Sequence, residues 1–119
     1  MKLTEAEWAV LEILWSGDRF ALKDITNALK DTKSWNKNTV YTYLTRMEAK
    51  GLVTIDRRQE KPYGAAVSRE SCAKEERREL LDKVYGGSAG DLIAAFLKES
   101  EISAKEAARL RKLLDDMEV

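Results

Sequence analysis

The stretch from Ser34 to Gly51, SWNKNTVYTYLTRMEAKG, constrains the fold more than any other part of the sequence. Its apolar residues recur at i, i+3, i+4 and i+7, which predicts one buried helical stripe made of Val40, Tyr43, Leu44 and Met47. Asn36 is a candidate N-cap, and Gly51 is a candidate for the position just beyond the last turn. The pattern therefore predicts an amphipathic helix from about 36 to 50.

The polar face of this helix carries an ammonium group, a carboxamide, hydroxyls and a phenol, but no carboxylate. It consists of Lys37, Asn38, Tyr41, Thr42 and Thr45. These groups can hydrogen-bond to base edges and phosphates without repelling a polyanion. The face suits a DNA recognition helix, although an ordinary solvated helix is the alternative that this segment alone leaves open.

The residues before the helix predict the rest of a helix-turn-helix. Thr4-Glu5-Ala6-Glu7 has the form of a capping box, followed by a helix to about Trp15. After a short extended segment at 19–21, the sequence predicts a second helix at 22–30, with Leu22, Ile25, Ala28 and Leu29 facing inward. Residues 31–34 then form a polar connection to the recognition helix, which is helix-turn-helix order.

The residues after the helix predict a basic hairpin. β-Branched residues and alternation at 52–58 indicate a strand, 59–64 a loop, and 65–67 a short return strand. The hairpin carries three cations suited to DNA phosphates, namely Arg57, Arg58 and Lys61. Its position in the chain favours a wing over a solvated hairpin that merely carries arginines.

The C-terminal half predicts a helix at 68–85, a break at Gly86-Gly87 and two further helices that begin at Ser88 and Ser103. Fifty residues make a marginal core alone, and a second copy of the chain would cover the apolar stripes. We therefore predict a dimerisation module, with folding back onto the first half as the alternative. Its contact residues are Leu80, Leu81, Val84, Tyr85, Leu92, Ile93, Phe96, Leu97, Leu110, Leu113, Leu114 and Met117.

Composition limits the possible functions. The 119 residues carry 21 basic and 21 acidic side chains. The segment 30–64 holds eight basic and four acidic residues, a local positive patch suited to a defined DNA site.

Without histidine and with one cysteine, the sequence predicts no enzyme, no cofactor and no metal site. The lack of a signal peptide or apolar span predicts a cytoplasmic protein.

Together these patterns predict a mainly α (α+β) fold. We expect a winged helix-turn-helix DNA-binding domain at 1–68, with a small β-hairpin as its wing. A helical dimerisation domain of three helices is expected at 69–119.

The chain resembles the BlaI/MecI/CopY family of bacterial repressors, the penicillinase-repressor type, nearly from end to end. The motifs that carry the resemblance are TEAEW at 4–8, WNKNTVYT at 35–42, LTRM at 44–47, KGL at 50–52, VYGG at 84–87 and the helix at 92–97.

The resemblance implies a homodimer that binds a palindromic double-stranded DNA operator with TACA/TGTA-like half-sites. It implies base contacts from Lys37, Asn38, Thr39, Tyr41 and Thr42. Arg46 and Lys50 are expected to face the DNA backbone. A membrane sensor protease is a further implied partner, but without membrane insertion of this chain itself.

Two positions depart from the pattern of the family. Its copper-responsive branch ends in paired cysteines, whereas this chain has only Cys72, which argues against copper sensing. Its β-lactam branch is cut at an Asn-Phe bond, where this chain has Ala95-Phe96, so regulatory cleavage stays open. A winged-helix protein-interaction module without sequence-specific DNA binding is the alternative function.

Overall fold

The computed structural model describes residues 2–117, which form six helices and one two-stranded antiparallel sheet. This is the mainly helical architecture, with a small hairpin, that the sequence predicts. The chain divides into two compact units, Met1–Arg77 and Arg78–Val119. None of the helices within residues 2–117 is long and apolar enough to span a membrane.

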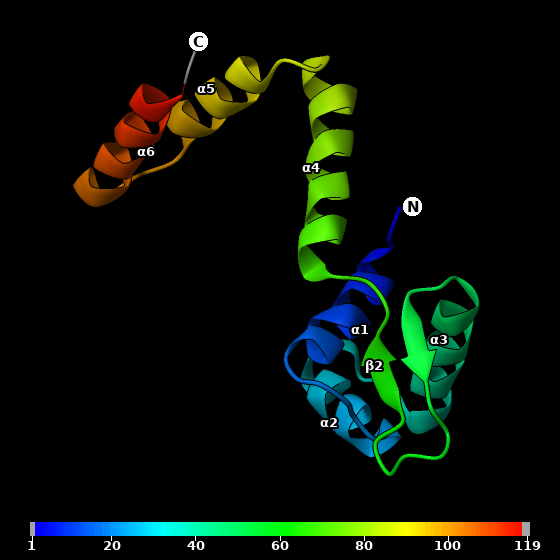
Figure 1. Cartoon of the computed structure of the whole chain (residues 1–119). Coiled ribbons are helices and arrows are strands. Elements are labelled where there is room, and N and C mark those ends of the chain that lie inside the picture. Colours follow the sequence, from blue (N-terminus) through cyan, green and yellow to red (C-terminus); the bar gives the residue numbers. More distant parts are fainter. Residues whose placement is uncertain (1, 118–119) are drawn as a thin grey trace. The chain divides into compact units, whose positions relative to one another are not determined.

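The first unit contains three helices, α1 (Glu5–Trp15), α2 (Leu22–Lys33) and α3 (Lys37–Ala49), and the sheet of β1 (Val53–Ile55) and β2 (Tyr63–Ala65). Figure 1 shows α1, α2 and α3 gathered around one centre, with the sheet beside α1 and α3. The fully buried side chains of this centre come from all three helices and are Val10, Leu11, Leu14, Ile25, Leu29, Val40, Leu44 and Met47. Ala28 is exposed, so the prediction that it faces inward is wrong.

Local capping sets the ends of the helices. Thr4 and Glu7 form the predicted capping box, in which Glu7 N–H donates to Thr4 Oγ1 (3.1 Å) and Thr4 N–H donates to Glu7 Oε1 (3.0 Å). Asn36 caps α3 by accepting from Thr39 N–H at 2.9 Å. Gly51 follows α3 with φ +80°, a conformation that glycine adopts without steric cost.

The predicted end of α2 at residue 30 is wrong. The helix continues through Lys33, and Ser34 closes it in the left-handed region, with its N–H donating to Lys30 O. Lys30 and Lys33 lie in this last turn, where cations suit the helix dipole. The turn that separates α2 from α3 is therefore only residues 34–36.

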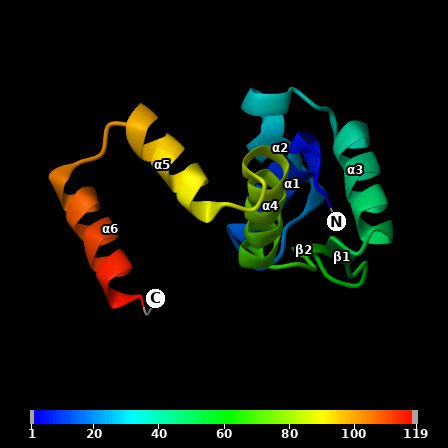
Figure 2. The same ribbon diagram turned by 90° about the horizontal axis from the view of Figure 1, so that it is seen from above.

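The wing is shorter than predicted, and its return strand comes earlier. Val53 pairs with Ala65, Thr54 with Gly64 and Ile55 with Tyr63. The predicted return strand at 65–67 therefore begins two residues too late. Tyr63, which lies in the predicted loop, pairs with Ile55 and also forms an isolated bridge with Phe20. Figure 2 shows both strands of the sheet.

Helix α4 (Arg69–Tyr85) belongs to both units. Its residues up to Arg77 are part of the first unit, and Cys72 among them is buried in the core of that unit. The compact units consequently divide within α4, whereas the sequence places the boundary between functional domains at 68/69, which stays a prediction.

The second unit continues with α5 (Ala89–Glu99) and α6 (Ala104–Asp116). Ser88 and Ser103 cap them by accepting from Asp91 N–H (3.2 Å) and Glu106 N–H (3.1 Å). Figures 1 and 2 both show that the chain reverses its direction between α5 and α6.

Candidate nucleic-acid interface

The outward face of α3 is exposed and free of carboxylates along its first ten residues, 37–46. Opposite it, Val40, Leu44 and Met47 have no exposed surface and fix the rotation of the helix. The exposed side chains on the outward face are Lys37, Asn38, Tyr41, Thr42, Thr45 and Arg46. Thr39, also predicted to face bases, is only partly exposed.

The two threonines of this face already use their hydroxyl protons within the helix. Thr42 Oγ1 donates to Asn38 O, and Thr45 Oγ1 donates to Tyr41 O, both at 2.9 Å. Each side chain therefore presents acceptor lone pairs and a methyl group to a ligand. A methyl group suits the C5-methyl of thymine, and the carboxamide of Asn38 suits the adenine edge.

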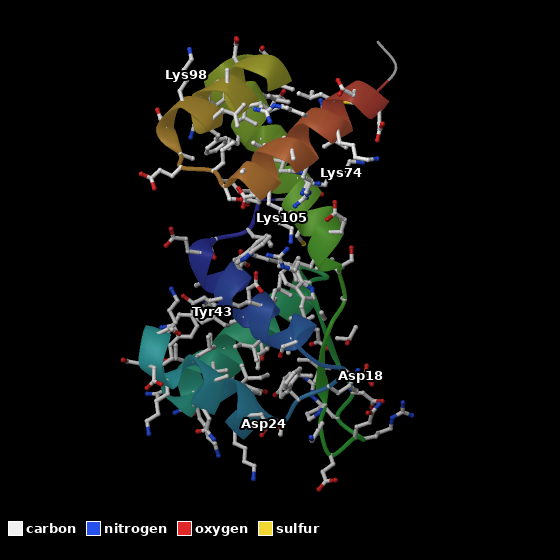
Figure 3. All side chains as sticks on the ribbon, turned by 90° about the vertical axis from the view of Figure 1, so that its left-hand side faces the viewer. Asp18, Asp24, Tyr43, Lys74, Lys98 and Lys105 are labelled. Carbon is white, nitrogen blue, oxygen red and sulfur yellow. The ribbon has the colours of Figure 1, made fainter. Side chains whose placement is uncertain are left out.

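An aromatic stack supports the start of α3. The rings of Trp35 and Tyr43 are 4.5 Å apart and nearly parallel at 15°, and Lys33 Nζ lies 5.9 Å from the Trp35 ring centre. Figure 3 labels Tyr43. Trp35 therefore packs within the protein and helps to orient the N-terminal turn of α3.

The five cations predicted to contact phosphates fall into two groups. Three have acidic partners: Lys50 Nζ lies 2.6 Å from Glu7 Oε2, Arg58 Nε lies 3.1 Å from Asp56 Oδ1, and Arg57 Nη2 lies 3.8 Å from Glu48 Oε1. Arg46 and Lys61 make no ion pair among residues 2–117.

The tip of the wing is organised by Asp56. Its carboxylate accepts hydrogen bonds from the side chains of Arg58 and Gln59 and from the backbone of Arg58. These bonds, with the Arg58 side chain first, lower the pKa of Asp56 to about 2. The carboxylate thus stays ionised at neutral pH and holds the turn after β1.

Arg19 anchors the wing from outside it, a role for which no local sequence pattern is a signal. Its guanidinium donates from Nε to Lys61 O at 3.0 Å and from Nη2 to Pro62 O. Beside it, Phe20 exchanges two backbone hydrogen bonds with Tyr63, at 2.8 and 3.0 Å. The segment between α1 and α2 therefore fixes where the wing lies relative to α3.

The second unit leaves most of its large apolar side chains exposed within a single chain. These are Leu80, Val84, Ile93, Phe96, Leu97, Ile102, Leu113, Leu114 and Met117. Leu81, Tyr85, Leu92 and Leu110 are partly buried. Charged groups such as Lys98 point outward (Figure 3).

The Ala95-Phe96 bond lies inside α5, and the Phe96 side chain is 53% exposed. A peptide bond within a regular helix must unwind locally before a protease can bind it in an extended form. Regulatory cleavage at this bond, which the sequence leaves open, would therefore require local opening of α5.

Comparisons with known proteins agree with this geometry. The family model described as penicillinase repressor matches residues 3–116. The methicillin resistance regulatory protein MecI of Staphylococcus aureus (strain N315) is 26% identical over 117 residues, which cover 96% of this chain and 94% of that protein. A penicillinase repressor of Staphylococcus aureus is 25% identical over 98% of this chain and 94% of its own length. A penicillinase repressor of Bacillus licheniformis is 20% identical over 97% and 91%.

Proposed function

The chain belongs to the penicillinase repressor family, and from this premise we propose that it is a DNA-binding transcriptional repressor whose α3 enters the major groove. The observation that carries the proposal is the exposed face of α3, which lacks carboxylates over residues 37–46 and is backed by three fully buried side chains. An α-helix fits the major groove, where each base pair presents a distinct pattern of donors and acceptors.

The side chains on this face have complementary roles in the proposal. Lys37, Asn38, Tyr41 and Thr42 lie along the part of α3 that would face base edges, with Thr39 at its border. Arg46 and the wing residue Lys61 have no acidic partner among the described residues and would neutralise phosphates. Base contacts determine the sequence that is bound, whereas phosphate contacts supply affinity and set the register.

We further propose that two copies of the chain associate through the second unit. Its exposed leucines, valine, isoleucines, phenylalanine and methionine, which lie on α4, α5 and α6 and in the segments that flank α6, would otherwise remain in water. A symmetric dimer buries the same surface from both copies and presents two α3 helices, which matches a palindromic operator. Membership of the penicillinase repressor family, for which the sequence resemblance implies a homodimer, supports this assembly.

The test is a binding titration with a TACA/TGTA palindrome and a scrambled duplex of equal length, at several fixed salt concentrations. The proposal expects preference for the palindrome. Equal affinity for both duplexes would refute sequence-specific binding. Protein capture without any DNA binding would favour the protein-interaction module instead.

Thr42→Ala separates base readout from electrostatic attraction. The substitution removes the outward methyl and acceptor of one side chain, so it should lower discrimination between the duplexes by about 1–3 kcal/mol if Thr42 contacts a base. Lys61→Ala is the matched control, because a phosphate contact should weaken both duplexes alike.

A further inference from the structure

Glu7 is a buried charged residue in the first unit. It lies near the start of α1 and retains only 4% of its surface exposed. One carboxylate oxygen, Oε1, accepts from Thr4 N–H as part of the capping box. The other, Oε2, accepts from Lys50 Nζ at 2.6 Å. A buried carboxylate is costly unless it is both paired and hydrogen-bonded, and this one is both.

The two partners of this ion pair belong to different helices. Glu7 lies in the first turn of α1, and Lys50 is the C-cap of α3. The contact therefore ties the C-terminal end of the recognition helix to the N-terminal end of α1. Val40, Leu44 and Met47 fix the rotation of α3 by apolar packing, whereas a directional ion pair at its end also resists sliding along its axis.

The same contact alters what Lys50 can offer to DNA. With a carboxylate oxygen at 2.6 Å, the charge of the ammonium group is largely neutralised, and moving it towards a phosphate would leave Glu7 buried without its counterion. The Glu7 side chain is only 5% exposed, whereas that of Lys50 is 49% exposed, so the cost falls on the buried carboxylate, which would lose its counterion. Retaining the ion pair is thus favoured over a phosphate contact.

We propose that Lys50 and Glu7 form a latch that positions the recognition helix, and that Lys50 acts on operator choice through Glu7 instead of as a phosphate contact. This inference rests on the proposed function, because the latch matters for readout only if α3 reads DNA. Lys50 and Glu7 are accordingly positioning residues. A shift of α3 by a fraction of an ångström at this end would misplace side chains such as Thr42 relative to base edges.

Glu7→Gln is the cleanest test because Glu7 is too buried to touch DNA itself. The amide oxygen of glutamine can still accept the capping-box hydrogen bond from Thr4 N–H. Its uncharged NH2 group replaces the carboxylate oxygen that accepts from Lys50. We expect affinity for the palindrome to fall on the order of tenfold, with a smaller change for the scrambled duplex. Glu12→Gln, which alters a partly exposed carboxylate on the same helix that bonds Arg69 and Trp8, is the matched control and should leave both affinities unchanged.

Lys50→Met and Lys50→Arg complete the test. Under the latch, Lys50→Met lowers palindrome affinity without changing the slope of log K against log salt, and adding Glu7→Gln causes no further loss. Lys50→Arg restores binding, because a guanidinium also pairs with a carboxylate.

The opposite pattern overturns the proposal. If Lys50 contacts phosphate, Lys50→Met reduces the salt slope by about one and weakens both duplexes alike, while Glu7→Gln frees the ammonium and strengthens or preserves binding.

Hydrogen exchange tests the latch without DNA. In Glu7→Gln, the amide groups of the last turn of α3 should exchange faster than in Glu12→Gln, and equal protection in the two variants would refute the positioning role. This measurement remains decisive if the wild-type protein fails to prefer the palindrome, or if Lys50→Met does not fold.

Discussion

Leu114 of α6 offers a quantitative test of the dimer. Its side chain is 60% exposed in a single chain, and it lies on the apolar stripe of the helix. Complete burial of a leucine side chain contributes about 1.5–3 kcal/mol, so covering the exposed part contributes about 1–2 kcal/mol. An alanine at this position would retain part of this burial free energy, so the substitution should cost about 1 kcal/mol for each copy. A symmetric dimer counts the loss twice, and about 2 kcal/mol corresponds to roughly a 30-fold higher dimer Kd.

Sedimentation equilibrium over a concentration series that brackets the dimer Kd measures this change. Lys112→Ala is the control, because Lys112 lies on the opposite face of α6 and loses only an exposed ion pair with Asp116 at 3.3 Å, which contributes about 0.3–0.5 kcal/mol to the helix. Helix content by circular dichroism should stay unchanged in both variants. The reasoning is refuted if Leu114→Ala and Lys112→Ala dimerise equally well, or if the wild-type protein is monomeric at micromolar concentration.

Three further predictions concern the first unit. Arg19→Ala removes two hydrogen bonds to the wing backbone, so the free energy of unfolding in urea should fall by about 1–2 kcal/mol, and affinity for both duplexes should fall as Lys61 loses its position. Leu44→Ala empties a fully buried site in α3 and should cost about 2–5 kcal/mol in the same assay; a loss below 1 kcal/mol would contradict the packing. Burial raises the pKa of Glu7, but the hydrogen bond from Lys50 and further contacts with Thr4 and Lys50 outweigh it, so this pKa lies below its ordinary value of 4.5. The stabilisation of the fold by ionised Glu7 is therefore fully present above pH 4.5 and is lost as the pH falls from 4.5 through the lowered pKa of the folded protein. The difference in the free energy of unfolding between wild type and Glu7→Gln should shrink as the pH falls in this way.

Features that depend on neighbouring residues were predictable from the sequence. The capping box at Thr4, the N-cap at Asn36 and the glycine after α3 each act within a few residues, so their patterns survive in the linear sequence. The same holds for the buried stripe of α3, because helical periodicity places those residues on one face. The end of α2 was missed because Ser34 closes it in a left-handed conformation that is uncommon for serine.

Contacts between residues that are far apart in the sequence were not predictable from local patterns. The family resemblance implies that Lys50 faces the DNA backbone, but the ammonium group of Lys50 has an ion-pair partner, Glu7, that lies 43 positions away in the sequence. Arg19 lies outside the basic segment 30–64, yet it holds that segment's loop across a separation of 42 and 43 positions. Counting charges along the sequence therefore does not show which cations already have an acidic partner within the protein.

These distant contacts also explain how so small a wing can keep a defined position. An isolated hairpin with three-residue strands is at best marginally stable in water. Here Phe20 adds a backbone bridge to Tyr63, and Arg19 binds two carbonyl groups of the loop. At the opposite end of the unit, Glu7 holds the last turn of α3. Each element proposed to touch DNA is thus contacted by a residue outside it: the wing by Arg19 and Phe20 of the segment between α1 and α2, and the end of α3 by Glu7 of α1. These contacts together set the spacing between the recognition helix and the wing.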